Sequence, residues 1–405
     1  MHMSQRVPYE AELLRPNVFE VDLDAIAHNL NEIQRWIGQG TRMFAVLKCN
    51  AYGFGLREVG QVVQESSAYG IAVADLTEAV DLRRHGVRKP ILVYANNLPG
   101  AARTYVDYDL IATVGDAAYA DAYAQAATRS LKVFMKVDVG LHRNGVYPED
   151  LPQLVACIKR TRHLRVEGIY AHLNVYDPTS DPDYLNWQFD RFRQAVDEAE
   201  RLGLSPPIRM VASSPVVAQC PTMYLNAVDP GKLMYGVYWP SGPHPSMKLA
   251  NPFRALKTRI IAKKRIVPGA FDDRLDFAVG SGRVFGVVPL GWGDGFPPAH
   301  AAKGWVLVRG KRVRVLGALH VEHARIDLSD VPDAEVGDEV TVIGRQGTEE
   351  ISLQEVAGEC GLGGSELTRT VRGHVPRLFY RGGQAVKIRT ILGERGLPEL
   401  PGSHG

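Results

Sequence analysis

Short apolar runs alternate with amphipathic stretches between residues 44 and 228, and this repetition leaves few folds open. Helical patterns lie between several of the runs, as at 190–202, and another, at 24–37, precedes the first. Repeated βα units with buried strands indicate a parallel sheet, and eight of them predict a (β/α)8 TIM-like barrel. An open doubly wound sheet stays possible, although no GxGxxG follows an early strand. The predicted strands are 44–47, 70–73, 90–93, 110–113, 132–137, 166–171, 208–211 and 226–228.

The pattern changes near residue 245, where prolines and glycines mark a loop. Beyond it, strand-like runs are separated by turn residues such as Arg309-Gly310-Lys311, which is typical of β-hairpins. We therefore predict an α/β chain of two domains, the barrel over 17–245 and a mostly β domain over 246–393. The Gly/Pro-rich segment 394–405 is predicted to be a flexible tail. The predicted strands of the second domain are 256–266, 285–290, 305–308, 313–319 and 339–343.

Composition and charge narrow the class of protein. The formal net charge is +2, which gives no reason to expect nucleic acid or a membrane surface as a partner. No apolar run approaches the length of a membrane span, and residues 1–16 lack an apolar signal core. The four cysteines show no CxxC spacing, so we expect no metal site and no disulfide framework. A cytoplasmic protein with free thiols is predicted.

Lys48 lies at the carboxyl end of the first apolar run, followed by a turn of small residues and Tyr52. A lysine there has the barrel wall behind it and an open mouth in front. Desolvation lowers the pKa of such an amine, and a neutral amine can form a Schiff base. The alternative is an ordinary surface lysine at a strand end.

The run 44–55, Phe-Ala-Val-Leu-Lys-Cys-Asn-Ala-Tyr-Gly-Phe-Gly, resembles the signature of alanine racemases and related fold-type III pyridoxal phosphate enzymes. Segment 135–145 is similar to the family's "KxDTGMxRxG", and 228–236 to its "VRPGxxxYG". Further similar segments follow the family's order at 19–30, 168–172, 289–296 and 375–381. The resemblance thus extends over both domains.

The resemblance implies pyridoxal 5'-phosphate as cofactor, with Lys48 carrying it. Arg143 would contact the cofactor's phenolate oxygen and the substrate carboxylate, and Lys136, carbamylated in the family, would orient that arginine. His172 would lie against the ring. The alternative for Lys136 and Arg143 is an ordinary surface pair, and the alternative for His172 is a core histidine with no role in the site. The implied cofactor-binding set is Lys48, Tyr52, Arg143, His172, Ser214, Asp229, Gly231, Lys232 and Tyr235.

Asp229 stands where alanine racemases have an arginine facing the pyridine nitrogen. An aspartate favours the protonated ring, which is a stronger electron sink. Amino acid decarboxylases of the same fold use an acidic residue in this way. The alternative is that Asp229 points to solvent and another group meets the nitrogen.

A second departure concerns the catalytic tyrosine that alanine racemases carry in the β domain. The equivalent segment, 274–282, has no tyrosine, and Phe277 is its nearest counterpart. His320 or His323 is a candidate replacement acid or base. As strand residues they would face opposite ways, so at most one would point into the site. Trp292 replaces a tyrosine of the family's "GYxDG" segment. The predicted substrate-binding residues are Arg143, Lys136, Trp292 and Val321.

These residues predict a pyridoxal phosphate-dependent racemase or epimerase acting at the α-carbon of an amino acid through an aldimine and a quinonoid. The departures argue against a standard alanine racemase. An amino acid decarboxylase, or another lyase or aldolase, is the first alternative, and a non-catalytic pyridoxal phosphate-binding protein is the second. The resemblance also implies a homodimer with composite active sites.

Overall fold

The computed structural model describes residues 13–237, 246–266, 283–300 and 303–397. The chain divides into two compact units. One comprises residues 25–51 and 55–250, and the other comprises residues up to Asp24, 52–54 and those from Asn251 onward. Among the described residues, no helix is both long and apolar enough to cross a membrane.

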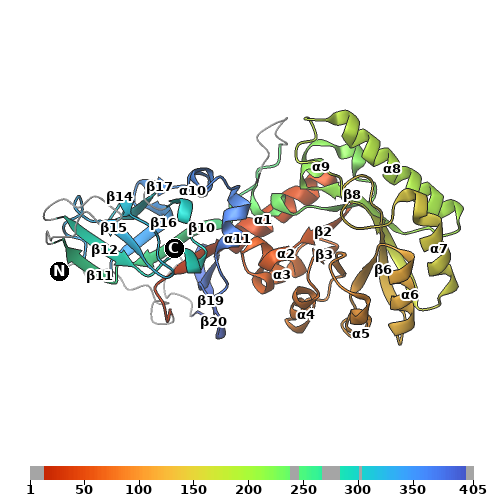
Figure 1. The fold of residues 1–405 in the computed structure, drawn as a ribbon, viewed down its shortest axis with the longest axis horizontal. Coiled ribbons are helices and arrows are strands. Elements are labelled where there is room, and N and C mark those ends of the chain that lie inside the picture. The colour runs from red at the N-terminus through yellow and green to blue at the C-terminus, as the bar shows by residue number, and fades with distance from the viewer. Residues whose placement is uncertain (1–12, 238–245, 267–282, 301–302, 398–405) are drawn as a thin grey trace. The chain divides into compact units, whose positions relative to one another are not determined.

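The first unit is a closed barrel of parallel strands, each paired with its neighbour in sequence order, and the last pairs with the first. This confirms the predicted barrel, with all eight strands at the expected places. Figure 1 shows helices outside the strands. The strands are β2 (Arg42–Val46), β3 (Gly70–Val73), β4 (Ile91–Val93), β5 (Ile111–Val114), β6 (Leu131–Lys136), β7 (Leu164–Tyr170), β8 (Ile208–Ser213) and β9 (Ala227–Asp229). The helices are α1 (Leu23–Ile37), α3 (Leu56–Glu65), α4 (Leu76–Arg84), α5 (Ala102–Asp107), α6 (Ala117–Ala126), α7 (Leu151–Arg160), α8 (Pro182–Arg201) and α9 (Ser214–Gln219).

Two phenylalanine rings are buried together on the barrel strands. Phe44 of β2 and Phe134 of β6 are fully buried, with ring centroids 5.7 Å apart and planes at 75°. Glycines on neighbouring strands make room for them. A Cβ on Gly70 would lie 2.9 Å from the Phe44 ring, and one on Gly168 would lie 2.7 Å from the Phe134 ring. Large and small side chains are thus matched across adjacent strands.

Gly168→Ala is expected to lower the free energy of unfolding by about 1–3 kcal/mol, the usual penalty for overpacking a core. The added methyl group would also lie 2.9 Å from the carbonyl oxygen of Ile208, which cannot move aside as a side chain can. Urea unfolding measures the change. Gly40→Ala is the matched control, because a Cβ there meets no atom within 4 Å. Equal stability of the two variants would contradict this account of the interior.

The second unit is built on a mostly antiparallel sheet, as predicted, flanked by two short helices, α10 (Leu353–Glu359) and α11 (Gly364–Thr370). Its strands lie in the order β11-β12-β15-β14-β13-β16-β10-β1-β18-β19-β20, with β17 paired to β16. They are β1 (Val18–Asp22), β10 (Phe253–Arg259), β11 (Ala262–Arg265), β12 (Val284–Val288), β13 (Trp305–Val308), β14 (Lys311–Leu316), β15 (Ala324–Asp327), β16 (Glu339–Gln346), β17 (Glu349–Ile351), β18 (Arg377–Arg381), β19 (Gln384–Thr390) and β20 (Gly393–Gly396).

Two boundaries differ from the sequence prediction. The predicted barrel domain, 17–245, includes β1, but this strand pairs with β10 and β18 of the other unit. A short buried strand carries no local sign of which sheet it will join, and its partners lie more than 200 residues away. The predicted flexible tail begins at 394, yet residues up to Gly396 form β20, paired with β19. The tail from residue 398 lies outside the described residues.

Candidate active site

The carboxyl ends of the barrel strands bring together most of the predicted site residues. This is the end at which barrels of this type carry their active sites. Lys48 follows β2, Lys136 ends β6, His172 follows β7 and Asp229 ends β9. Arg143 lies in the loop after β6, Ser214 begins α9, and Gly231, Lys232 and Tyr235 follow β9.

The turn after Lys48 is left-handed over four consecutive residues, none of them glycine. Cys49, Asn50, Ala51 and Tyr52 have φ angles of 57°, 54°, 52° and 56°. Such a conformation costs roughly 1–2 kcal/mol for each L-residue. Strain of this kind persists only where the surroundings hold it, and it is concentrated at functional sites. The turn therefore marks Lys48 as part of a built site.

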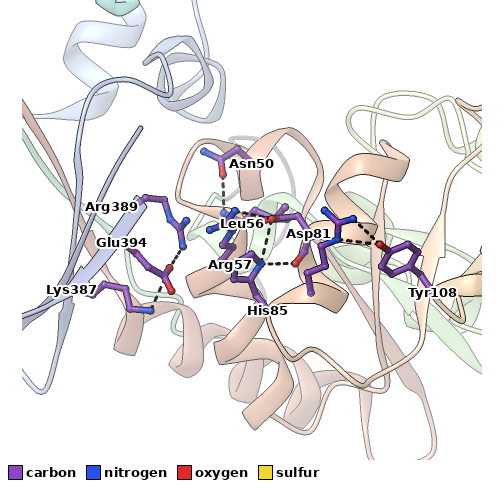
Figure 2. Close-up of polar contacts among 10 residues, drawn as sticks. Asn50, Leu56, Arg57, Asp81, His85, Tyr108, Lys387, Arg389 and Glu394 are labelled. Carbon is purple, nitrogen blue, oxygen red and sulfur yellow. Dashed lines mark hydrogen bonds and ion pairs between the residues drawn. The ribbon is translucent and has the colours of Figure 1, made fainter. Parts of the chain in front are cut away.

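Asn50 is the residue through which the fold holds this turn. Its backbone N–H donates to Oε1 of Glu78 on α4, at 2.6 Å, and its side-chain oxygen accepts from the N–H of Leu56, at 2.8 Å. Figure 2 shows the bond to Leu56 and the ion pair of Arg57 with Asp81, 2.7 Å long, that ties the start of α3 to α4. Two helices thus stabilise the strained turn beside Lys48.

Cys49 offers a direct measure of this strain, because it is exposed and glycine adopts its φ without penalty. Cys49→Gly is expected to be about 1 kcal/mol more stable than Cys49→Ala, since the alanine keeps the Cβ that makes the left-handed conformation costly. Urea unfolding of the two variants measures the difference. Equal stability of both would show that the turn stores little energy.

Asp138 shapes the loop that presents Arg143. Its carboxylate accepts from the backbone N–H groups of Gly140, His142 and Arg143, at 3.0, 3.0 and 2.8 Å. These bonds help to keep the pKa of Asp138 below its usual value, although burial opposes them. No hydrogen bond or ion pair joins the Arg143 guanidinium to another side chain in the described part of the chain. Its N–H groups can therefore donate to a carboxylate or phenolate oxygen of a bound molecule.

Lys136 and His172 sit in a strongly cationic part of the barrel. Burial, and then the charge of Arg143, lower the pKa of Lys136 to about 8. Burial, followed by the charges of Arg143, Lys136 and Lys48, lowers the pKa of His172 to about 3. The imidazole is therefore neutral at pH 7, which suits packing against a ring. A fraction of Lys136 is neutral as well, and a neutral amine is the form that reacts with electrophiles.

Asp229 is buried, with 6% of its surface exposed, and its two carboxylate oxygens differ. Oδ2 accepts a hydrogen bond from the Tyr94 hydroxyl at 2.7 Å. Oδ1 is buried and has no hydrogen-bond partner among the described residues. Burial raises the pKa of Asp229 to about 7, against the opposing effects of Tyr94, Lys48 and Lys136. The alternative in which this carboxylate points to solvent is thereby excluded.

Ser214 and the segment after β9 form a compact polar group. The Ser214 hydroxyl oxygen accepts from the N–H groups of Gly231 and Leu233, at 2.8 and 3.3 Å. Lys232 places its ammonium group 5.1 Å from the centre of the Tyr176 ring. The Tyr235 hydroxyl donates to the carbonyl of Val46, at 3.2 Å, and so braces the end of β2 that carries Lys48.

These residues fit the pyridoxal phosphate implied by the resemblance. An unpartnered buried carboxylate oxygen, as at Asp229, is expected where a protonated ring nitrogen would bind. Lys48 is only half-buried, and its charge acts on both Asp229 and His172. Whether each predicted residue touches the cofactor stays a prediction.

The β-domain candidates lie in two loops that bind each other through backbone hydrogen bonds. The N–H of Trp292 donates to the His320 carbonyl at 3.1 Å, and that of Gly293 to the Val321 carbonyl at 2.7 Å. Trp292 and Val321 are exposed by 47% and 52%. The prediction that His320 and His323 alternate along a strand is wrong. Strand β14 ends at Leu316, and the N–H of His320 donates to the His323 carbonyl, which closes a tight turn.

Sequence reasoning gave no role to two residues of the site, Tyr94 and Asp138. Tyr94 directly follows β4, so the rule that barrel strands end at the active site could have found it. Asp138 lies inside a quoted motif, but its three hydrogen bonds depend on a loop conformation that the motif does not spell out.

Comparisons with known proteins cover both domains. The family model for the alanine racemase N-terminal domain matches residues 21–239, and that for the C-terminal domain matches 255–379. The chain is 33% identical to the alanine racemase of Desulforamulus reducens over 366 residues, 89% of this chain and 98% of the relative. It is also 33% identical to that of Desulfosudis oleivorans over 384 residues, 91% of this chain and 98% of the relative.

Solved structures agree with these sequence matches. The alanine racemase of Bacillus anthracis with bound L-Ala-P superposes with a TM-score of 0.85 at 29% identity, covering 94% of this chain and 99% of that one. The alanine racemase of E. faecalis gives a TM-score of 0.79 at 29% identity, covering 91% and 99%.

Proposed function

We propose that this chain, which belongs to the alanine racemase family of pyridoxal phosphate enzymes, interconverts L- and D-alanine. The observation that carries the proposal is the convergence of Lys48, Arg143 and His172 at the carboxyl end of one barrel. The expectation that the chain is not a standard alanine racemase finds no support in the comparisons, whose named relatives are alanine racemases over about nine-tenths of the chain.

In this proposal Lys48 holds the cofactor and moves a proton on one face of the substrate's α-carbon. When bound, the cofactor withdraws electrons from that carbon and makes its proton acidic. Arg143 binds and orients the substrate carboxylate. Neutral His172 supports the ring, Asp229 keeps the ring nitrogen protonated, and Tyr52, Ser214, Gly231 and Lys232 hold the phosphate. Carbamylation of Lys136 would replace its repulsion of Arg143 by attraction.

The opposite face of the substrate needs a second proton donor. The segment in which the family carries its tyrosine, 274–282, lies outside the described residues. We keep His320 and His323 as candidates, both exposed on the turn beside Trp292. The resemblance implies a homodimer with composite active sites, and in that assembly the exposed Trp292 and Val321 would be covered. A cytoplasmic location stays a prediction from the sequence.

Racemisation in deuterated water tests the proposal. The holoenzyme with L-alanine should yield D-alanine that carries deuterium at the α-carbon, measured by chiral chromatography and mass spectrometry. Unlabelled D-alanine, or none, would contradict it. Asp229 favours one alternative, decarboxylation, because a protonated ring is the stronger electron sink. That activity would release carbon dioxide from an amino acid panel without forming the D-isomer.

A further inference from the structure

The hydrogen bond between Tyr94 and Asp229 links residues 135 positions apart. Tyr94 is the first residue after β4, and Asp229 is the last residue of β9. The bond uses one carboxylate oxygen and leaves the other, Oδ1, buried without a partner among the described residues. Because the carboxylate group is rigid and planar, a hydrogen bond to Oδ2 also fixes the direction in which Oδ1 points.

The surroundings of Tyr94 hold it in place. Its ring lies 5.7 Å from the ring of Tyr170, whose hydroxyl is 3.1 Å from that of Thr113. The Thr113 hydroxyl in turn donates to the carbonyl of Val93, directly before Tyr94. On the other side, the Asn144 amide donates to the carbonyl of Ala95 at 2.8 Å. Since Asn144 follows Arg143, this bond ties the Tyr94 segment to the loop that carries the arginine.

We infer that Tyr94 is a positioning residue of the reaction, which fixes Asp229 through Oδ2 so that Oδ1 faces the ring nitrogen of the bound cofactor. The inference rests on the proposed function. Tyr94 would act on the cofactor through Asp229, so its effect should disappear when the side chain at 229 can no longer accept its hydrogen bond.

Hydrogen bonding also affects the ionisation of Asp229. The Tyr94 hydroxyl is the largest of the effects that oppose the rise in its pKa on burial. Without the hydroxyl, neither oxygen would have a side-chain donor among the described residues, and a buried carboxylate with fewer donors takes up a proton more readily. A neutral carboxyl group would no longer balance the charge of a protonated ring.

The test compares Tyr94→Phe with the wild type, both alone and in the Asp229→Ala background, with Tyr69→Phe as control. In the wild-type background, Tyr94→Phe is expected to weaken pyridoxal phosphate binding by the apoenzyme about 10-fold or more and to lower kcat similarly, with KM nearly unchanged. In the Asp229→Ala background, which has no acceptor for the Tyr94 hydroxyl, the same change should alter neither quantity by more than about 2-fold, since the two residues act as one unit. Tyr69→Phe should match the wild type.

A further readout needs no cofactor. The free energy of unfolding of the apoenzyme falls with rising pH because of Asp229. In Tyr94→Phe this fall should extend to higher pH, because the loss of the hydroxyl raises the pKa of Asp229. The inference is overturned if Tyr94→Phe binds the cofactor as tightly as the wild type, or if its loss is the same in both backgrounds. A wild-type protein that binds no pyridoxal phosphate overturns both proposals. A protein that binds the cofactor normally but does not act on alanine overturns the proposed function alone.

Discussion

Lys48→Ala is expected to lower the rate of alanine racemisation by at least about 10⁴-fold, because it removes the amine that anchors the cofactor and the group that moves a proton. The hydrogen bonds of Asn50 that hold the left-handed turn at 49–52 do not involve Lys48, so the variant should fold. Chiral chromatography measures the rate, and the absorption spectrum with added pyridoxal phosphate reports cofactor attachment.

Lys159→Ala is the matched control, since Lys159 is an exposed lysine of α7 whose ammonium group donates to the carbonyl of Leu202. This variant should keep wild-type activity and the wild-type spectrum. If Lys48→Ala retained more than about a hundredth of the wild-type rate, the lysine would be neither the anchor nor an essential base. The absorption spectrum distinguishes the two roles, since an unchanged spectrum would show that Lys48 does not anchor the cofactor.

Asp229→Asn is expected to change the pH dependence of the apoenzyme's stability. Burial is the main reason why the pKa of Asp229 is raised from 3.8 to about 7 in the folded protein. Between these values the folded state holds a proton that the unfolded state has lost. The free energy of unfolding therefore falls as pH rises through this window, by up to about 4 kcal/mol. Asparagine does not titrate, so the variant should lack this fall.

The effect of His172 on the pH dependence of stability has the opposite sign to that of Asp229. Its pKa is lowered to about 3 in the folded protein, so its contribution to stability rises as pH increases toward its ordinary value. The wild type and the Asp229→Asn variant share this effect, and the difference between their urea unfolding curves from pH 5 to pH 8 isolates Asp229. Parallel pH profiles for the two proteins would contradict the buried, partly protonated carboxyl group.

Asp229→Asn should also slow racemisation by about 10²–10³-fold, the penalty of removing one member of a buried charge pair. Asp229→Arg offers the opposite test, because an arginine would disfavour the protonated ring nitrogen. We expect a changed cofactor spectrum and slower turnover of alanine. Faster racemisation, or an unchanged spectrum, would show that another group meets the ring nitrogen.

The barrel could be predicted because its strands are short buried apolar runs with clear ends, a signal that lies in neighbouring residues. The sequence does not show which sheet β1 joins, because its partners, such as Lys257 and Arg377, lie far along the chain. The sequence predicts a strand at His320 because this residue follows the apolar run 313–319, whereas β14 ends at Leu316. Local pattern does not show where a strand leaves its sheet.

The site was predictable in its residue types and much less in its geometry. Lys48 and Arg143 stand in recognisable segments, so the sequence could nominate them. The left-handed turn gave no signal, since its four residues include no glycine, the usual mark of a positive φ. Cys49 and Asn50 adopt that conformation because contacts from α3 and α4 oppose the strain.

The sequence by itself determined the eight short strands, the lysine at the end of the first of them and the aspartate in place of an arginine, because each depends on residues that are adjacent or nearly so. Only the tertiary structure decided the state of that aspartate. Burial raises its proton affinity, and a tyrosine 135 residues earlier donates to one oxygen and leaves the other without a partner among the described residues. Desolvation and hydrogen bonding depend on what the folded chain places around a group, and no local pattern carries that information.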